Sequence, residues 1–328
     1  MGYNAGKGNT TGHSNVYIGN NAGVANPSGG GNVMIGLDAG KNATGDNTVI
    51  IGNQAGQNNA ANNNIYIGSL AGNSNASGQC NIFMGYEAGK FYKGTSNDNN
   101  KTGCIFIGDG AGNGNGNTAT GLYNTMLGYY AGFQHKSGGM NTFIGCTAGR
   151  NNKDGVGNVF IGYDAGYNEK GSNLLYISNS STSTPLIWGD FSAKVVKVNG
   201  SQVSTSDQRF KENIKTLYGS LAKITSIRGV SFTWKTNDEI NKIKGIKTDS
   251  IDNSRLQDGT QLGVIAQEVE KVLPELVHTD EGGFKSVDYT KLAPVLIEAI
   301  KELKAEKDNL QQQVDELKQL VEQLLKSR

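Results

Sequence analysis

The chain has 328 residues, of which 30 are Lys or Arg and 29 are Asp or Glu, so its formal net charge is +1. This balance argues against the basic surface by which proteins bind nucleic acid or an anionic membrane, and we expect neither partner. No apolar run has the length of a transmembrane helix, so we expect no membrane insertion. The three cysteines and three histidines are scattered without metal-ligand spacing, and we therefore expect no metal site and no cofactor.

Glycine divides the chain into two parts of different character. Residues 1–190 hold 39 of the 47 glycines but only nine basic and nine acidic residues, whereas residues 191–328 hold most of the charged residues. A change of composition this large predicts a change of architecture near residue 190.

A short repeat fills the first part. Its unit is Asn, two apolar or Thr positions, Ile, Gly, two variable residues, Ala and Gly, and nine copies are spaced 16 to 23 residues apart, with clear examples at 141–149 and 158–166. Each unit predicts one short strand, a glycine turn and a polar loop, as in one coil of a β-solenoid. Because so small a coil does not bury its own apolar side, we expect three chains to wind together over residues 1–170 as a trimeric β-solenoid or β-roll.

The repeat resembles those of trimeric adhesin heads and phage tail fibres, particularly in its Asn-x-x-Ile-Gly core. Residues 2–6 match only the second half of a unit, so we expect the chain to be a fragment of a longer fibre.

The acidic residues of the repeats are dispersed and do not form the paired carboxylates of a glycan-degrading enzyme. Five tyrosines could stack on sugars, although such residues more often pack between coils: Tyr3, Tyr86, Tyr129, Tyr163 and Tyr167.

Three further strands are predicted after the last unit. They lie at 174–177, 185–191 and 195–200, with a Ser/Thr-rich turn after the first. We expect residues 171–205 to form a β cap that protects the open edge of the solenoid.

The second part has the pattern of an α+β domain. Apolar residues predict a helix over 214–224, and alternation predicts a strand over 230–234. A strand over 262–265 should lead into an amphipathic helix over 266–273, and residues 236–259 should form a polar loop between the two halves.

A long helix ends the chain, beginning near Tyr289. Its seam of apolar residues predicts a coiled coil over 291–328, and since no second helix of matching length exists, the helix should pair with other copies in parallel. Leu and β-branched residues in the core positions fit a coiled coil of two helices as readily as one of three. Lys307 in this seam either fixes the register of the helices or is a tolerated defect. The seam is Leu296, Ile300, Leu303, Lys307, Leu310, Val314, Leu317, Val321 and Leu324.

Between the two parts lies the hexapeptide Ser-Asp-Gln-Arg-Phe-Lys at 206–211. A serine hydroxyl becomes a nucleophile when a neighbouring base takes its proton, and a lysine acts as that base when burial lowers its pKa. The spacing of Ser206 and Lys211 alone is weak, because Ser206 and Asp207 would equally suit a helix cap.

The second part as a whole resembles the C-terminal intramolecular chaperone of endosialidase-type tailspikes, a self-cleaving Ser-Lys peptidase domain. The resemblance is carried by the motifs at 206–211, 263–269, 273–277, 287–289 and 296–300. It implies an α+β chaperone and peptidase domain over residues 206–290, with the coiled coil following.

By the family pattern, Ser206 is the nucleophile and Lys211 the general base. We expect the cut between Thr205 and Ser206, because Ser206 reaches the preceding carbonyl through a five-membered ring. Cleavage on the other side of Ser206 is the alternative. Asp207 and Arg209 match the motif, but a cap and an ion pair explain them.

Together these features predict the distal part of a viral or injection-particle tail fibre that binds a cell-surface receptor, with a glycan as one candidate. The chaperone would align three chains and then cleave itself off, so the enzyme activity is a single-turnover autoproteolysis. The protein would be made in the host cytoplasm and reside in a virion tail fibre or other extracellular particle. The alternatives are a glycan-degrading tailspike with the same chaperone and a cellular trimeric adhesin that is not cleaved.

Overall fold

In the computed structural model the chain forms two compact units, Met1–Val203 and Ser204–Arg328. None of the helices in the described residues is long and apolar enough to cross a membrane. The described residues are 2–94, 102–116, 119–201, 203, 205–235, 239, 259–280 and 282–327.

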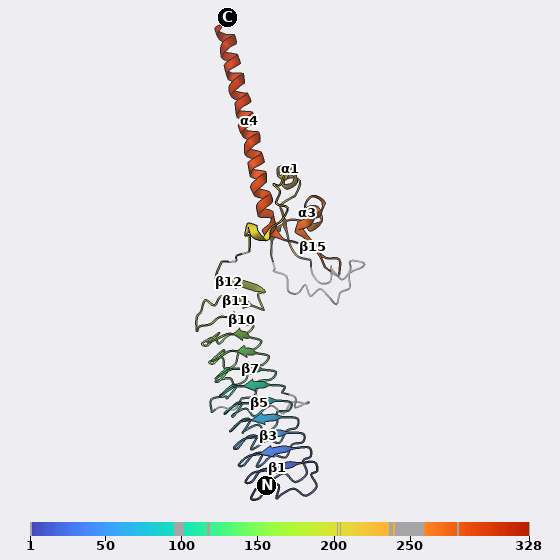
Figure 1. Cartoon of the computed structure of the whole chain (residues 1–328), viewed down its shortest axis with the longest axis vertical. Coiled ribbons are helices and arrows are strands. Elements are labelled where there is room, and N and C mark those ends of the chain that lie inside the picture. Colours follow the sequence, from blue (N-terminus) through green and yellow to red (C-terminus); the bar gives the residue numbers. More distant parts are fainter. Residues whose placement is uncertain are drawn as a thin grey trace. The chain divides into compact units, whose positions relative to one another are not determined.

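The first unit is a β-solenoid, which confirms the predicted fold of the repeats (Figure 1). Each repeat contributes one strand of three residues, and successive strands pair in parallel and in register, so that Thr142 of one coil lies beside Val159 of the next. In the described residues the repeats form nine strands: β1 (Val16–Ile18), β2 (Val33–Ile35), β3 (Val49–Ile51), β4 (Ile65–Ile67), β5 (Ile82–Met84), β6 (Ile105–Ile107), β7 (Thr125–Leu127), β8 (Thr142–Ile144) and β9 (Val159–Ile161).

The core of the solenoid forms within one chain. From β2 to β9 the middle residue of each strand points inward and is fully buried, and so is the alanine of each Ala-Gly pair. Aromatic middle residues stack from coil to coil, as Phe143 does on Phe160, with ring centroids 4.9 Å apart. The expectation that three chains are needed to form this core was wrong, because each coil packs its inward side chain against its own alanine and the coils on either side.

A ladder of buried asparagines explains the Asn that opens seven of the nine repeats; Thr48 and Cys104 take its place before β3 and β6. Asn141 Oδ1 accepts a hydrogen bond from the backbone N–H of Asn158 at 2.9 Å, and Asn141 Nδ2 donates to the carbonyl of Gly155 at 2.7 Å. These bonds join one coil to the next and close the corner before the strand. Buried polar groups need such partners, which accounts for an amide at this position. The ladder includes Asn32, Asn64, Asn81, Asn124, Asn141 and Asn158.

Two glycines of the repeat are required by close packing. Gly145, after a strand, has φ +133°, and a Cβ there would lie 2.4 Å from the carbonyl oxygen of Gly162. Gly149, after the buried alanine, has φ +60°, and a Cβ there would lie 2.6 Å from the ring of Phe143. A side chain at either position would therefore force adjacent coils apart or displace the core aromatic ring.

The three strands expected after the last repeat are present. Strand β10 (Leu174–Ile177) continues the parallel sheet beside β9, whereas β11 (Ile187–Asp190) and β12 (Val195–Val198) add antiparallel strands to it. The change of direction at β11 ends the stack of coils.

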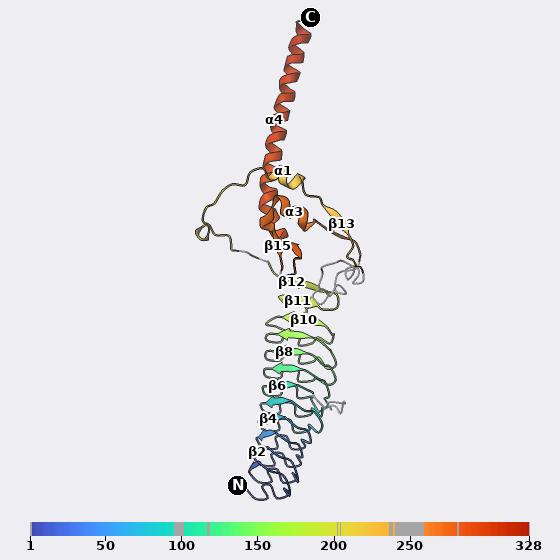
Figure 2. The ribbon, with the colours of Figure 1, turned by 90° about the vertical axis from the view of Figure 1, so that its right-hand side faces the viewer.

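In the second unit, helices α1 (Ser220–Thr225) and α3 (Ala266–Val272) pack beside the start of the long helix α4 (Leu292–Lys326) (Figure 2). The core of this unit is formed by Val269, Leu273, Leu276 and Val295. The other described elements are, in chain order, η1 (Gln208–Phe210), β13 (Val230–Phe232), β14 (Gln261–Gly263), η4 (Pro274–Leu276), β15 (Val277–Thr279), β16 (Lys285–Val287) and η5 (Tyr289–Lys291).

The first helix of this unit is shorter than predicted. The helix expected over 214–224 begins only at Ser220, because Gly219 before it takes a left-handed conformation with φ +65°. The α1 N-terminus is instead closed by Glu302 of α4, whose carboxylate accepts hydrogen bonds from the backbone N–H groups of Ser220 and Leu221. The polar loop expected over 236–259 lies outside the described residues except at 239 and 259.

Helix α4 carries the predicted seam, and within the single chain most of that seam faces solvent. Val295 and Ala299 near its start are buried, but every apolar seam residue beyond them is exposed, for example Ile300 at 65% and Leu324 at 67%. A helix with an exposed apolar seam of this length is typical of a coiled-coil strand without its partners.

Candidate active site around Ser206 and Lys211

A tight turn brings the two predicted catalytic residues together. Asp207 caps η1, its Oδ1 accepting the backbone N–H of Arg209 at 2.9 Å, and the backbone N–H of Lys211 donates to the carbonyl of Gln208 at 3.0 Å. The guanidinium of Arg209 also pairs with the carboxylate of Asp207 at 2.7 Å. Hydrogen bonds from this guanidinium and from the Arg209 backbone lower the pKa of Asp207, so the cap stays ionised. Asp207 and Arg209 thus form the cap and the ion pair considered in the sequence.

The turn places the lysine amine on the serine hydroxyl. Lys211 Nζ donates a hydrogen bond to Ser206 Oγ at 2.7 Å. This distance lies within the range that links a nucleophile to its base in covalent catalysis. Thr205, the residue of the expected scissile bond, directly precedes Ser206 and is exposed. Helix capping and Ser–Lys pairing therefore coexist, because the cap is made by Asp207 and leaves the Ser206 hydroxyl free for the lysine.

Solvent surrounds this pair in the single chain. Ser206 and Lys211 are both exposed. A lysine becomes a general base when burial beside apolar groups favours its neutral form. One chain thus brings the two side chains within hydrogen-bond distance and leaves both exposed to solvent.

Comparison with known protein families identifies the segment that begins at this serine. Residues 206–278 match the chaperone of endosialidase family. The match starts at Ser206 and ends within β15, so it confirms the resemblance over residues 206–278. The motifs at 287–289 and 296–300 lie beyond the matched residues. The family is classed as peptidase S74, which supports self-cleavage of such a chaperone domain in general. A search of curated proteins found no match.

The chaperone domain also contains a groove that none of the predicted site residues lines. Its volume is about 820 Å³, and Phe232, Trp234, Leu262 and Tyr289 supply much of its wall. Among the described residues that line it, the groove combines these apolar side chains with two basic residues, Arg228 and Lys285, and no carboxylate. At one side Arg228 forms an ion pair with Glu268, which lowers the pKa of that carboxyl.

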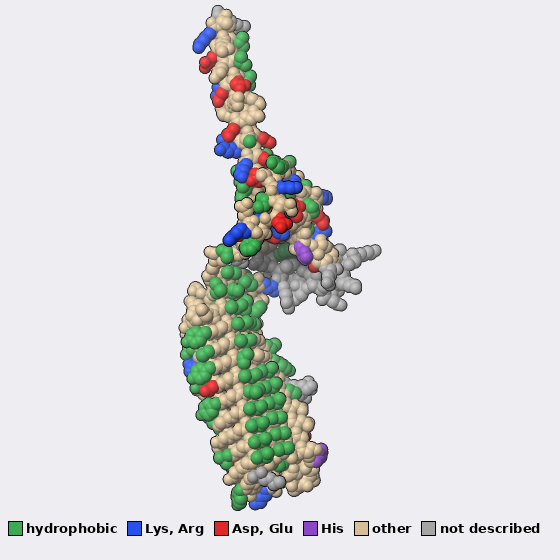
Figure 3. Space-filling view, viewed as in Figure 1, with side chains coloured by type: hydrophobic (Ala, Val, Ile, Leu, Met, Phe, Trp, Pro, Cys, Tyr) green, Lys and Arg blue, Asp and Glu red, His purple; other side chains and the backbone are tan. Residues whose placement is uncertain are grey.

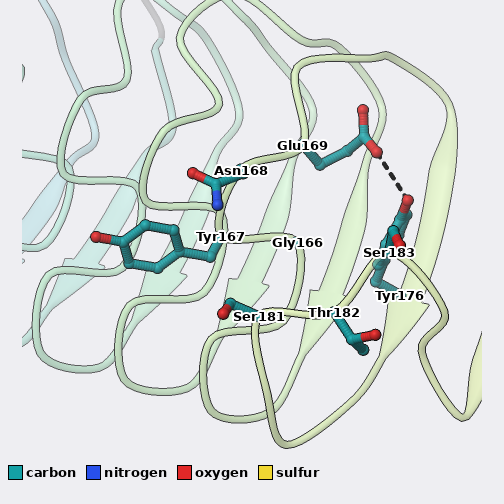
Figure 4. A pocket seen from close by; sticks show the side chains of 8 residues that line it. All are labelled: Gly166, Tyr167, Asn168, Glu169, Tyr176, Ser181, Thr182 and Ser183. Atoms are coloured by element: carbon teal, nitrogen blue, oxygen red, sulfur yellow. Dashed lines mark hydrogen bonds between the residues drawn. The ribbon is translucent and has the colours of Figure 1, made fainter.

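A smaller pocket of about 300 Å³ lies at the last coil of the solenoid (Figure 4). Glu169 in its wall is a residue that the sequence did not single out, and it occupies the place where the preceding coil has the buried Asn152. Its carboxylate accepts hydrogen bonds from the Tyr176 hydroxyl at 2.7 Å and from the backbone N–H groups of Lys170 and Gly171. Burial opposes ionisation of Glu169, but these hydrogen bonds outweigh it and lower the pKa. The carboxylate is thus committed to closing the corner of the coil.

The tyrosines considered for sugar stacking fall into two groups. Tyr167 packs between coils, because Arg150 lies over its ring at 5.6 Å and donates to its hydroxyl at 2.7 Å. The other four keep about half or more of their surface exposed: Tyr3, Tyr86, Tyr129 and Tyr163. No cluster of metal-ligating side chains occurs within the described ranges.

Proposed function

We propose that the chain is the distal part of a homotrimeric tail fibre whose chaperone domain aligns three copies and then cuts itself off at Ser206. The observation that carries this proposal is the 2.7 Å hydrogen bond between Lys211 Nζ and Ser206 Oγ, at the first residue of the family match. The exposed seam of α4 supports association, because the same helix of other copies would cover it in a coiled coil.

The cut follows from the position of the hydroxyl. Ser206 Oγ attacks the carbonyl carbon of Thr205 through a five-membered ring while neutral Lys211 takes the hydroxyl proton. The C–N bond then breaks, the lysine returns the proton to the departing amine, and an ester joins Thr205 to Ser206. Water hydrolyses this ester, leaving a carboxylate on Thr205 and a free amino group on Ser206. Attack on the other side of Ser206 would instead release a fragment that begins at Asp207.

Assembly supplies what one chain lacks. The neighbouring copies would bury the exposed Ser206 and Lys211 and so favour the neutral amine, which delays the cut until the fibre has formed. Repetitive coils are prone to register slip, and a coiled coil at the chain end raises the effective concentration of the other copies. Removing the chaperone after folding leaves a fibre that unfolds only slowly.

The carrier would be a virion tail fibre or another extracellular particle, made in the host cytoplasm. Its partner would be a cell-surface receptor. Exposed tyrosines along the solenoid, such as Tyr86 and Tyr163, support a glycan as the candidate, because aromatic faces stack on sugar rings.

A denaturing gel of the purified full chain tests the cut. The wild type should give fragments 1–205 and 206–328, whereas Ser206→Ala and Lys211→Met should stay whole. Lys215→Met is the matched control, because Lys215 is also an exposed lysine, four residues after Lys211 in the sequence, and the change should leave cleavage unchanged. A wild type that stays whole, or a Lys211→Met variant that is cut at the normal rate, would contradict the proposal. The mass of the C-terminal fragment decides whether it begins at Ser206 or Asp207.

A further inference from the structure

One side of the solenoid sheet is apolar along its whole length. The first and third residues of each strand point away from the core, and we call these outward side chains of β1 to β9 the strand face. Sixteen of them are apolar, two are Thr, and none is charged. Figure 3 shows hydrophobic side chains in columns that run along the solenoid. The strand face consists of Val16, Ile18, Val33, Ile35, Val49, Ile51, Ile65, Ile67, Ile82, Met84, Ile105, Ile107, Thr125, Leu127, Thr142, Ile144, Val159 and Ile161.

The core of the solenoid does not need these residues. The inward residue of each strand is fully buried from β2 onward, yet outward residues such as Ile18 and Leu127 remain 45% and 42% exposed. Charged side chains occur elsewhere on the coils, for example Lys41 and Lys90 after the Ala-Gly pair. A regular apolar column without a charge is unusual for a surface in water and indicates a covered surface.

The area of the strand face is that of a stable interface. Six of its eighteen residues are at least 36% exposed and the others are half-buried. At an average of ~50 Å² per residue the face presents on the order of 900 Å², more than the largest apolar patch of an ordinary monomer. That area is close to the ~800 Å² that each partner contributes to a stable protein interface. Nine strands at ~4.8 Å spacing make the face about 40 Å long, so a partner must match a long and regular row of side chains.

We infer that the strand face is the contact between copies of this chain in the assembled fibre, each copy presenting the same face to the others. The inference rests on the proposed homotrimer and adds the surface by which the solenoids meet. A second copy has the same repeat spacing and the same absence of charge, so in parallel register its columns match along the full length. A glycan would leave its hydroxyl groups without hydrogen-bond partners on such a surface.

Cysteine cross-linking of the full chain tests the inference. In a background with Cys80→Ser and Cys146→Ser, Ile67→Cys places a thiol on the strand face, and Ala60→Cys places one at an exposed position of the preceding coil outside that face. Mild oxidation should join copies through Ile67→Cys at least ~10-fold more than through Ala60→Cys, because the contact holds identical residues close together. Equal or greater cross-linking through Ala60→Cys would overturn the inference.

Charges on the face provide a second measurement. The double variant Ile51→Glu with Ile67→Glu should release single solenoids after the cut, whereas the wild-type solenoid fragment should stay oligomeric by native mass. With Ser206→Ala added, the uncut double variant should remain oligomeric through α4.

The two proposals fail in distinguishable ways. Oligomers of the full chain whose solenoid fragment is unaffected by the two glutamates would overturn only the strand-face contact. A full chain that never associates would overturn the homotrimer as well. Binding of the wild-type solenoid to lipid vesicles without self-association would assign the face to a lipid surface and would also overturn the contact.

Discussion

Replacing Asn141 by Ala should destabilise the solenoid by about 3 kcal/mol. The Asn141 side chain is buried and bonds three groups: the Asn158 N–H at 2.9 Å, the Gly155 carbonyl at 2.7 Å and Asn124 Oδ1 at 3.1 Å. Each hydrogen bond contributes about 1 kcal/mol net, and a buried group left without a partner costs about 1–3 kcal/mol. The three partners lie on adjacent coils, so losing these hydrogen bonds should weaken the stacking of one coil on the next.

Urea unfolding of the full chain measures this cost, with Ser206→Ala added to both proteins so that neither is cut. The matched control is Asn58→Ala, which removes two hydrogen bonds that are both exposed: one accepted from Asn42 Nδ2 at 3.0 Å and one donated to the Asn73 carbonyl at 3.2 Å. We expect this control to change the free energy of unfolding by less than about 0.5 kcal/mol. A loss below about 1 kcal/mol for Asn141→Ala, or equal losses for the two variants, would refute the view that the ladder joins the coils.

Three further predictions concern single side chains. Burial lowers the pKa of His135, so the unfolded chain binds a proton at this residue more readily than the folded chain does. The free energy of unfolding should therefore fall as the pH drops below about 6.5. Urea titrations at several pH values should show a flatter dependence for His135→Asn. Phe143→Ala should cost about 4 kcal/mol in the same assay, since Phe143 is fully buried and stacks on Phe160, while the exposed Tyr163→Ala should cost little. Glu302→Gln should speed hydrogen exchange of the Ser220 and Leu221 amides at pH 7, because the amide caps their N–H groups less strongly than the carboxylate does. In the wild type these N–H groups lower the pKa of Glu302, so the same exchange should become relatively faster as the pH falls through the folded-state pKa of this carboxylate. Unchanged protection of the two amides in the variant would argue against this cap.

Much of the fold could be predicted from local patterns. The spacing of the Asn-x-x-Ile-Gly units located all nine strands, because a strand of three residues followed by a required glycine leaves a strong mark in the sequence. The start of α1 could not be predicted, since Ile214 and Leu217 continue the apolar spacing but Gly219 and the Glu302 cap begin the helix at Ser220. Glu302 is 82 residues away from Ser220, so no local pattern reports this contact.

By itself the sequence determined the repeat architecture, the α4 seam and the pair Ser206 and Lys211, since each depends on periodicity or on neighbours a few residues apart. The tertiary structure decided that the core closes within one chain, that Asn141 and its equivalents join the coils, and which side of each strand is left exposed. It also showed that Asp207 forms the cap, leaving the serine to the lysine. The reason is physical: stacking of coils places residues 16 to 23 positions apart in contact, so which of the apolar residues in a strand are buried depends on those neighbours.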